Sequence, residues 1–424
     1  MIYFVFRQLL RITLRVFFKH MHVSNVENIP YNKPLVIAAN HPGAFLDPVL
    51  IACLIRKPIY FLVRGDVFKN KLIRWIFEQF NMLPVYRKDE GFGNIEKNHN
   101  TNSKVADVLH RNGIVVIFCE GYSATNRRLR TVLKGTARVC MDTAVAANID
   151  VKIIPAGISY THKTNFRKSV MLDFSAPISM LDYVNLYHQH PQKSFVSITA
   201  ELTRRLEQNF VIIKNEELDN LTETHLNYLR NNERYTFLPL VVRNNDKLYA
   251  ERLLCEKIHR CFEENPIGFR ELKTKTDEYE TALKTVELED RFLVKNPAPI
   301  RQMVLLTLGF PFFILGFMAW GIPYIISKAI ADKKVTRIDF HDSLTVNATT
   351  FLFGVMVFLL SILGYFIFGW YTILCYFILP PSSIIAGWHY DMATTFAVGF
   401  KPISNRSELI NKRNQLLKLQ NDLT

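Results

Sequence analysis

Two long stretches near the C-terminus carry no charged side chain, and they limit what this chain can fold into more than any other feature. The first, Met303 to Ile326, has 24 residues, and the second, Ser343 to Trp388, has 46. A helix needs about 20 apolar residues to cross the roughly 30 Å hydrocarbon core of a bilayer. The first stretch therefore predicts one span. The second predicts two, with a break at Gly369-Trp370-Tyr371, or one span and a re-entrant segment that ends at Pro380-Pro381.

The region before these stretches has a different pattern, in which short apolar runs alternate with helical periodicity. Strands are expected at 34–39, 58–63, 82–86, 114–119, 151–158 and 169–174, and helices at 44–56, 70–80, 101–112 and 135–148. Such alternation is typical of an α/β domain, here residues 24–190, with a layered mixed sheet flanked by helices. Residues 191–299 are charged and mostly helical in pattern, and they carry no motif that indicates chemistry. The predicted membrane region is 300–390, and a basic tail, 391–424, follows it.

The charge balance indicates an anionic partner. The net charge is +14, while only 21% of residues are charged and 49% are hydrophobic. Nucleic acid, an anionic membrane face and acidic substrates would all fit. We favour lipid, because the chain has strong apolar segments, no zinc-finger spacing and no RNA-binding aromatic signature. Six cysteines without a CxxC pair indicate reduced thiols in a protein that faces the cytosol.

Residues 1–23 have an amphipathic helical pattern. Arg7, Arg11, Arg15 and Lys19 recur every four residues and form one basic stripe on an otherwise apolar helix. We expect this helix to lie in the membrane interface, with the basic stripe toward the lipid headgroups. The alternative is a helix that packs on the core and keeps its basic face in water.

The first candidate site follows the apolar run 34–39. That run stops at Asn40-His41, turns through Pro42-Gly43 and reaches Asp47, six residues after the histidine. A histidine at a strand end can accept a proton near neutral pH, and a carboxylate beside it fixes its tautomer and stabilises its charged form. On a continuous helix, six residues correspond to about 600°, which would put the two side chains on different faces. They can meet only if part of the stretch is not helical.

Three further segments place polar groups at expected strand ends. They are Leu83-Pro84-Val85-Tyr86-Arg87, Phe118-Cys119-Glu120-Gly121 and Ile154-Pro155-Ala156-Gly157. A guanidinium suits phosphate because its donors reach two oxygens at once. A carboxylate after a strand can bind a hydroxyl or anchor a basic residue. The basic loop from Ser123 to Lys134 could attract phosphate, the coenzyme A nucleotide or anionic lipid.

In this order, the four segments resemble the four sequence blocks of the glycerolipid acyltransferases, the family of glycerol-3-phosphate and lysophosphatidate acyltransferases. The resemblance implies that His41 deprotonates the acceptor alcohol and that Asp47 orients the imidazole. It also implies that Arg87 holds the acceptor phosphate and that the fourth block shapes the wall of the acyl site. Further substrate contacts are expected from Asn40, Glu120, Gly121 and Lys134.

Two departures from the family pattern stand out. Five residues separate the histidine from the aspartate, where four are common, and a five-residue gap followed by Asp-Pro is similar to one subgroup of glycerol-3-phosphate and dihydroxyacetone-phosphate acyltransferases. Cys119 replaces the usual proline of the third block. Because nothing near it in sequence would lower its pKa, we interpret it as a packing substitute rather than a nucleophile.

The resemblance implies a membrane-bound O-acyltransferase of phospholipid synthesis. It would move a fatty acyl group from acyl-CoA or acyl-carrier protein to glycerol-3-phosphate or a related acceptor, with no cofactor and no metal. The alternatives are a lysophospholipid or amino-acid-lipid acyltransferase and an inactive lipid-binding membrane protein. The catalytic domain is expected to face the cytoplasm, but basic residues lie both between the apolar stretches and after them, so the topology stays open. The sequence does not indicate an oligomeric state.

Overall fold

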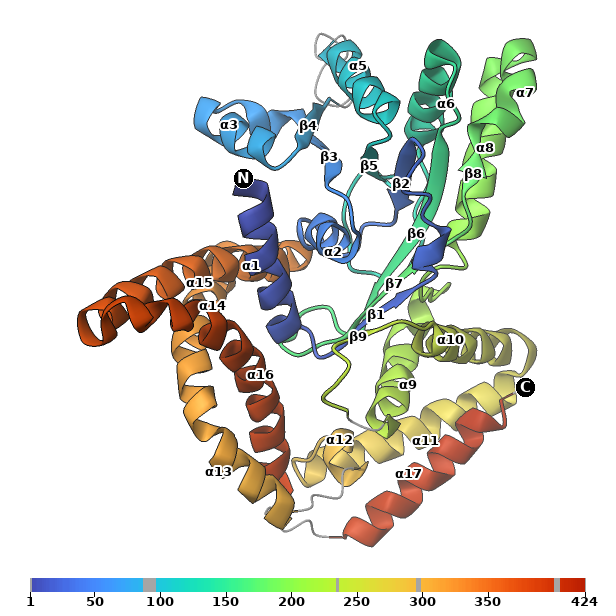
Figure 1. Cartoon of the computed structure of the whole chain (residues 1–424). Coiled ribbons are helices and arrows are strands. Elements are labelled where there is room, and N and C mark those ends of the chain that lie inside the picture. Colours follow the sequence, from blue (N-terminus) through green and yellow to red (C-terminus); the bar gives the residue numbers. More distant parts are fainter. Residues whose placement is uncertain (1, 87–96, 234–235, 295–298, 400–404, 424) are drawn as a thin grey trace.

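The structure is a computed structural model, and it describes residues 2–86, 97–233, 236–294, 299–399 and 405–423 (Figure 1). Its centre is a nine-stranded mixed sheet in the order β4-β3-β5-β2-β6-β7-β1-β9, with β8 paired to β6. The strands are β1 (Met21–Ser24), β2 (Leu35–Ala39), β3 (Ile59–Arg64), β4 (Met82–Val85), β5 (Ile114–Phe118), β6 (Lys152–Tyr160), β7 (Val170–Phe174), β8 (Ile178–Ser179) and β9 (Val241–Val242). The predicted α/β fold with a mixed sheet is confirmed.

The first five strands of that order run parallel, so their carboxyl ends meet at one edge of the sheet. β2 lies between β5 and β6 and is buried along its whole length. This agrees with its unbroken apolar sequence, which is typical of a parallel strand covered on both faces. The expected strands at 34–39 through 169–174 all form, while β1, β8 and β9 are additional.

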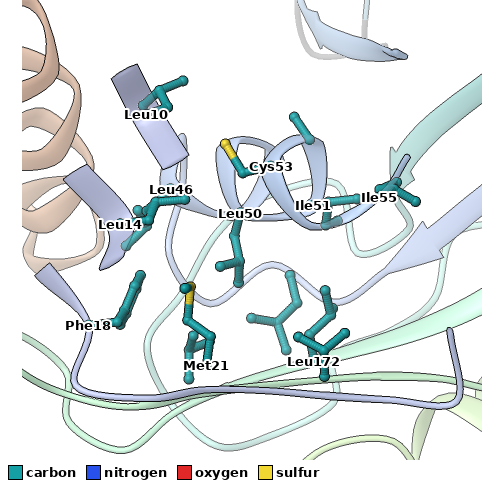
Figure 2. Packing of buried hydrophobic residues seen from close by; sticks show 14 of the residues in the cluster. Leu10, Leu14, Phe18, Met21, Leu46, Leu50, Ile51, Cys53, Ile55 and Leu172 are labelled. Atoms are coloured by element: carbon teal, nitrogen blue, oxygen red, sulfur yellow. The ribbon is translucent and has the colours of Figure 1, made fainter. Parts of the chain in front are cut away.

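Helices cover both faces of the sheet and continue beyond it (Figure 1). The helices are α1 (Ile2–Phe17), α2 (Leu46–Leu54), α3 (Lys71–Gln79), α5 (Lys97–His110), α6 (Gly135–Ala147), α7 (Val184–Gln189), α8 (Pro191–Leu206), α9 (Asp219–Asn232), α10 (Asp246–Glu264), α11 (Pro266–Thr285), α12 (Asp290–Val294), α13 (Pro299–Gly316), α14 (Ile322–Lys334), α15 (Ile338–Phe368), α16 (Cys375–Gly399) and α17 (Arg406–Asn421). Helices α5, α6 and α8 pack on one face. Helices α1 and α2 pack on the other, where Leu14 of α1 and Leu50 of α2 meet Met21 and Leu172 of the sheet (Figure 2).

Helix α1 does not expose its whole basic stripe, because Arg7 and Arg11 bond to α2, while Arg15 is exposed. Arg7 is buried, and its guanidinium donates to the carbonyl oxygens of Ala52 and Ile55 at the end of α2. Arg11 donates to the carbonyl oxygen of Cys53 at 3.0 Å. The last carbonyls of a helix lack intrahelical partners and attract cations. The expectation that this stripe faces lipid headgroups is therefore wrong for Arg7 and Arg11, since α2 takes up their donors.

The C-terminal apolar stretches form four helices in two antiparallel pairs. α13 packs along α16, and α14 packs along α15 (Figure 1). A short π-helical segment, η6 (Phe317–Gly321), joins α13 to α14. A 3₁₀ segment, η7 (Gly369–Leu374), separates α15 from α16 at the predicted break. By length and composition, two continuous segments could cross a membrane, Ile300–Lys334 and Ile338–Ala397.

A separate helical cluster is formed by residues from 211 to 293 together with the C-terminal helix. α17 packs on this cluster through Leu409 and Leu416, and Arg413 forms a buried ion pair with Asp290 at 2.6 Å. The segment expected to be a basic tail thus ends in a packed helix. In the described part of residues 191–299, helices α8 to α12 make up most of the structure, with the short strand β9 between α9 and α10.

Candidate active site

The first candidate segment forms a turn between β2 and α2, at the carboxyl edge of the parallel strands. Asn40 starts this turn and is buried. Its side-chain amide donates to the carbonyl oxygen of Ile158 at 3.0 Å, and its amide oxygen accepts the N–H of Ile158 at 2.7 Å. Both ends of the amide are therefore engaged with β6. Asn40, which was expected to contact substrate, anchors the turn to the neighbouring strand instead.

His41 and Asp47 meet across the turn. The Nδ1 atom of His41 lies 2.8 Å from Oδ2 of Asp47. α2 begins only at Leu46, and Ala44 has a positive φ of 45°, so the stretch between them is not helical. This is the condition that a six-residue separation requires for the two side chains to touch.

Asp47 is completely buried and fully engaged. Its Oδ2 also accepts the N–H of Gly43 at 2.8 Å, and its Oδ1 accepts the hydroxyl of Tyr160 at 2.6 Å. Burial, together with the negative charge of Asp47, raises the pKa of Tyr160 well above its usual value, so this hydroxyl remains a donor. Tyr160 was not predicted. The fourth block ends at Gly157, and only the alternation along β6 could have indicated that Tyr160 shares a face with Ile158.

An aromatic side chain stacks on the imidazole ring of His41. Phe118, the last residue of β5, stacks on it with ring centres 3.9 Å apart and planes 13° from parallel. The His41 side chain is 18% exposed. Because Nδ1 faces Asp47, Nε2 is the ring nitrogen left for a ligand, and no described residue bonds to it.

Glu120 supports the backbone of this site. It is buried, and its carboxylate accepts the N–H of His41 at 2.9 Å and the N–H of Arg130 at 3.0 Å. It also forms an ion pair with the guanidinium of Arg130. The sequence left two uses open for the Glu120 carboxylate, binding a hydroxyl or anchoring a basic residue. In the structure the carboxylate anchors Arg130. Gly121 follows with φ of 80°, in the left-handed region that favours glycine.

The basic loop is largely neutralised within the described part of the chain. Arg127 pairs with Glu223 at 2.6 Å, and Arg128 pairs with Asp219 at 2.9 Å. Arg130 differs, because its Nε and Nη1 atoms are buried and have no hydrogen-bond partner among the described residues. Its Cζ lies 4.5 Å from the ring centre of Tyr122.

Lys134 lies apart from the dyad. It is exposed just before the start of α6, which begins at Gly135. Among the described residues, Arg127, Arg128 and Arg130 each pair with a carboxylate, whereas Lys134 has no ion pair. The structure brings Arg130, but not Lys134, into contact with the turn through Glu120.

The C-terminal helices also reach the turn. Ser343 of α15 donates its hydroxyl to the carbonyl oxygen of Gly43 at 2.6 Å and accepts the N–H of Leu46 at 3.0 Å. These two bonds bridge the turn between His41 and Asp47 from a helix 300 residues further along the chain. No local signal in the sequence could have indicated this contact.

A buried ion pair lies behind the turn. Lys168, between β6 and β7, pairs with Asp342 of α15 at 2.5 Å, and its Nζ lies 4.5 Å from the ring centre of Tyr160. Burial lowers the pKa of Lys168, while the carboxylate of Asp342 opposes that shift. The pair joins the sheet domain to α15 beside the tyrosine that contacts Asp47.

Arg87 lies outside the described residues, as does the segment that follows it. β4 ends at Val85, at the same carboxyl edge of the sheet as the end of β2, with β3 and β5 between them. A cavity of about 300 Å³ lies beside β4 and is lined by Tyr86, Arg74, Thr101 and Lys104, among others.

Part of this chain matches known proteins. Residues 20–159 match the model of the Acyltransferase family. Over 113 residues the chain is 32% identical to glycerol-3-phosphate O-acyltransferase 2 of Saccharomyces cerevisiae, which is 26% of this chain but only 15% of that protein. Among solved structures, it is similar to the 1-acyl-sn-glycerophosphate acyltransferase PlsC of Thermotoga maritima, with a TM-score of 0.35 and 16% identity over 48% of this chain and 80% of that one. Residues 20–159, which contain His41, Asp47 and Glu120, thus match the model of the Acyltransferase family, and the rest of the chain lies outside that match.

Proposed function

We propose that this protein is a membrane-bound O-acyltransferase that transfers a fatty acyl group from acyl-CoA or acyl-carrier protein to the hydroxyl of glycerol-3-phosphate or a related glycerol phosphate. The observation that carries the proposal is the contact between His41 and Asp47, 2.8 Å through Nδ1, which leaves Nε2 for the acceptor. A hydroxyl is a poor nucleophile at neutral pH, and a positioned base contributes about 10²- to 10⁴-fold to its reaction.

The reaction needs only a base and an activated acyl group. Nε2 of His41 takes the proton of the acceptor hydroxyl as the oxygen attacks the thioester carbonyl carbon. The C–S bond of the resulting tetrahedral species then breaks, and the leaving sulfur takes the proton back from His41. The products are an ester and a free thiol, and no acyl-enzyme forms, because the thioester is already activated.

Asp47 has two parts in this scheme. Its carboxylate fixes the tautomer that has Nε2 free, and it stabilises the imidazolium that forms during the attack. Gly43 and Tyr160 hold the carboxylate in place through bonds of 2.8 and 2.6 Å. The orientation of the base is therefore set before substrate binds, which is the arrangement that efficient proton transfer requires.

Two arginines are the proposed contacts for the acceptor phosphate. Arg87 is assigned from the resemblance alone, and in the sequence it comes two residues after the end of β4. Arg130 is assigned from its two buried, unpartnered guanidinium nitrogens, which a phosphate oxygen could satisfy. Glu120 would then act by fixing Arg130 and the His41 backbone, rather than by touching substrate.

Membrane attachment is proposed from the two segments long and apolar enough to cross a bilayer. One of them contains α15, whose Ser343 bonds to the catalytic turn. A lysophospholipid acceptor remains the second candidate, because the same phosphate contacts and the same base would serve it.

The experiment is an acceptor panel with the purified full chain in lipid nanodiscs. Free thiol would be measured as palmitoyl-CoA or palmitoyl-acyl-carrier protein is consumed, with glycerol-3-phosphate, lysophosphatidate and glycerol as acceptors. We expect thiol release to depend on a phosphate-bearing acceptor. Arg130→Gln should raise KM more for glycerol-3-phosphate than for glycerol. Equal rates without any acceptor, or no transfer to the panel at all, would contradict the proposal.

A further inference from the structure

Helix α3 is an amphipathic helix whose apolar face is not covered by the described part of the chain. None of its nine residues is buried. Leu72 is 64% exposed and Trp75 is 52% exposed, and Ile73 and Ile76 are also exposed. On the surface of a soluble protein, an amphipathic helix normally turns its apolar stripe toward the core. An exposed stripe of this kind marks an interaction surface.

The helix itself is well defined, and Phe77 is its half-buried residue, packed edge-on against buried Phe68 with ring centres 5.3 Å apart. Asn70 caps its first turn by accepting the N–H groups of Leu72 and Ile73. Arg74 donates to the carbonyl oxygen of Phe68 at 3.3 Å. Arg74 and Glu78 also line the 300 Å³ cavity beside β4. At 100° per residue, Leu72, Ile73 and Ile76 lie on the opposite side, away from that cavity.

The neighbouring end of α1 extends the same apolar surface. Phe80, just after α3, packs edge-on against Phe6 of α1 with ring centres 5.2 Å apart. Figure 1 shows α3 near the N-terminal end of α1. At that end of α1, the side chains of Ile2, Phe4 and Val5 are exposed.

The surface also adjoins the candidate membrane segment, because α1 packs on α15. Leu10 and Leu14 of α1 belong to the same buried cluster as Phe353 and Val357 of α15. Helix α1 thus contacts both Phe80, next to α3, and a helix long enough to span a bilayer.

The composition of α3 matches the lipid–water boundary. Trp75 lies between the apolar and polar sides of the helix, and tryptophan favours this position because its ring is apolar and its N–H is polar. Exposed Lys69 and Lys71 flank the start of the helix, where their long side chains can reach phosphate headgroups.

We propose that α3 docks in the interface of an anionic bilayer, with Leu72, Ile73, Trp75 and Ile76 among the lipid chains. The docking puts the cavity beside β4 at the level of the headgroups. This inference depends on the exposed side chains of α3 and on the contacts of α1 with Phe80 and with α15, and it holds whichever acceptor the enzyme uses.

The experiment reads the environment of single nitroxide labels in the full chain. Every native cysteine is buried except Cys375, which is half-buried, so the background carries Cys375→Ser. Labels are placed by Leu72→Cys on the apolar side and by Glu78→Cys, the matched control, on the polar side. The protein is reconstituted in phosphatidylcholine vesicles with and without phosphatidylglycerol, and collisions with oxygen and with a water-soluble nickel chelate are measured.

In vesicles that contain phosphatidylglycerol, the label at residue 72 should collide with oxygen more often, and with nickel at least about threefold less often, than the label at residue 78. Equal nickel collisions at both sites would mean that the apolar side lies in water and would overturn the proposal. Low collisions with both reagents at residue 72 would mean that protein, such as a second copy of this chain, covers the face, and would overturn it too. Neither outcome depends on acyl transfer, so this experiment tests the docking of α3 independently of the proposed reaction.

Discussion

The turn that holds His41 follows β2, an inner strand of the sheet, whereas β3, α3 and β4 lie at the lateral edge of the sheet, and the two regions are built in opposite ways. In the turn, partners from β6, α2 and α15 fix both the backbone and the carboxylate of Asp47. At the edge, α3 has no buried residue. The contrast indicates that the groups proposed for proton transfer lie in a preorganised part of the fold. The exposed part remains accessible to substrate and lipid.

The two regions should respond differently to mutation. Leaving a buried polar group without its partner costs about 1–3 kcal/mol, whereas most exposed substitutions change stability by less than about 0.5 kcal/mol. Matched pairs of variants, one from the turn and one from a less constrained position, can therefore test whether the two regions differ in this way.

Asp47→Asn should have the largest effect of these pairs. An amide cannot stabilise the imidazolium of His41, and it can favour the wrong tautomer, so kcat for acyl transfer should fall by at least about 10²-fold. The matched control is Asp66→Asn, which removes an exposed ion pair with Arg64 at the open edge. Similar rates for the two variants in a thiol-release assay would contradict the prediction that the turn is more sensitive to mutation than the lateral edge.

Tyr160→Phe should have the next largest effect. It leaves Oδ1 of the buried Asp47 without its donor at 2.6 Å. We expect the free energy of unfolding to fall by about 1–3 kcal/mol and kcat to fall by about tenfold. Tyr60→Phe, in β3 beside the edge cavity, is the control and should change neither quantity appreciably. Denaturant unfolding and steady-state kinetics measure the two effects, and a wild-type kcat for Tyr160→Phe would contradict its positioning role.

Ser343→Ala tests whether α15 braces the turn. It removes both the donor to Gly43 and the acceptor for Leu46, so kcat should fall several-fold, with about 1–3 kcal/mol lost in stability. Ser361→Ala is a close control in the same helix, because its hydroxyl bonds only to the carbonyl oxygen of Val357 within that helix. If both variants lose the same activity, the effect belongs to the helix and not to the turn.

Cys119→Ala should have the smallest effect. The thiol is buried against the carbonyl oxygen of Ala39, and burial raises its pKa, so it is not a thiolate near neutral pH. Activity should stay within about threefold of wild type. A loss comparable to that of Asp47→Asn would show that the thiol takes part in the chemistry.

Much of the site could be predicted from local sequence, because it comes from strands that end in short motifs. The six predicted strands form, and the turn at Pro42-Gly43 lets His41 reach Asp47. Tyr160 and Ser343 could not be predicted, since they reach Asp47 and the turn only through tertiary packing. The sequence of α1 predicts a basic stripe. Helical periodicity indicates which residues share a face of the helix, but it does not indicate which part of the protein packs against that face. Arg7 and Arg11 bond to α2, and the exposed apolar side chains belong mainly to α3.

The most direct test of the central claim is the rate of acyl transfer by His41→Ala. The assay follows thiol release from palmitoyl-CoA with a saturating phosphate-bearing acceptor, and His188→Ala on the surface of α7 is the control. We expect His41→Ala to lose at least about 10²-fold in kcat while its unfolding transition stays cooperative, and His188→Ala to keep the wild-type rate. Product formation by His41→Ala at the wild-type rate would contradict the assignment of His41 as the base.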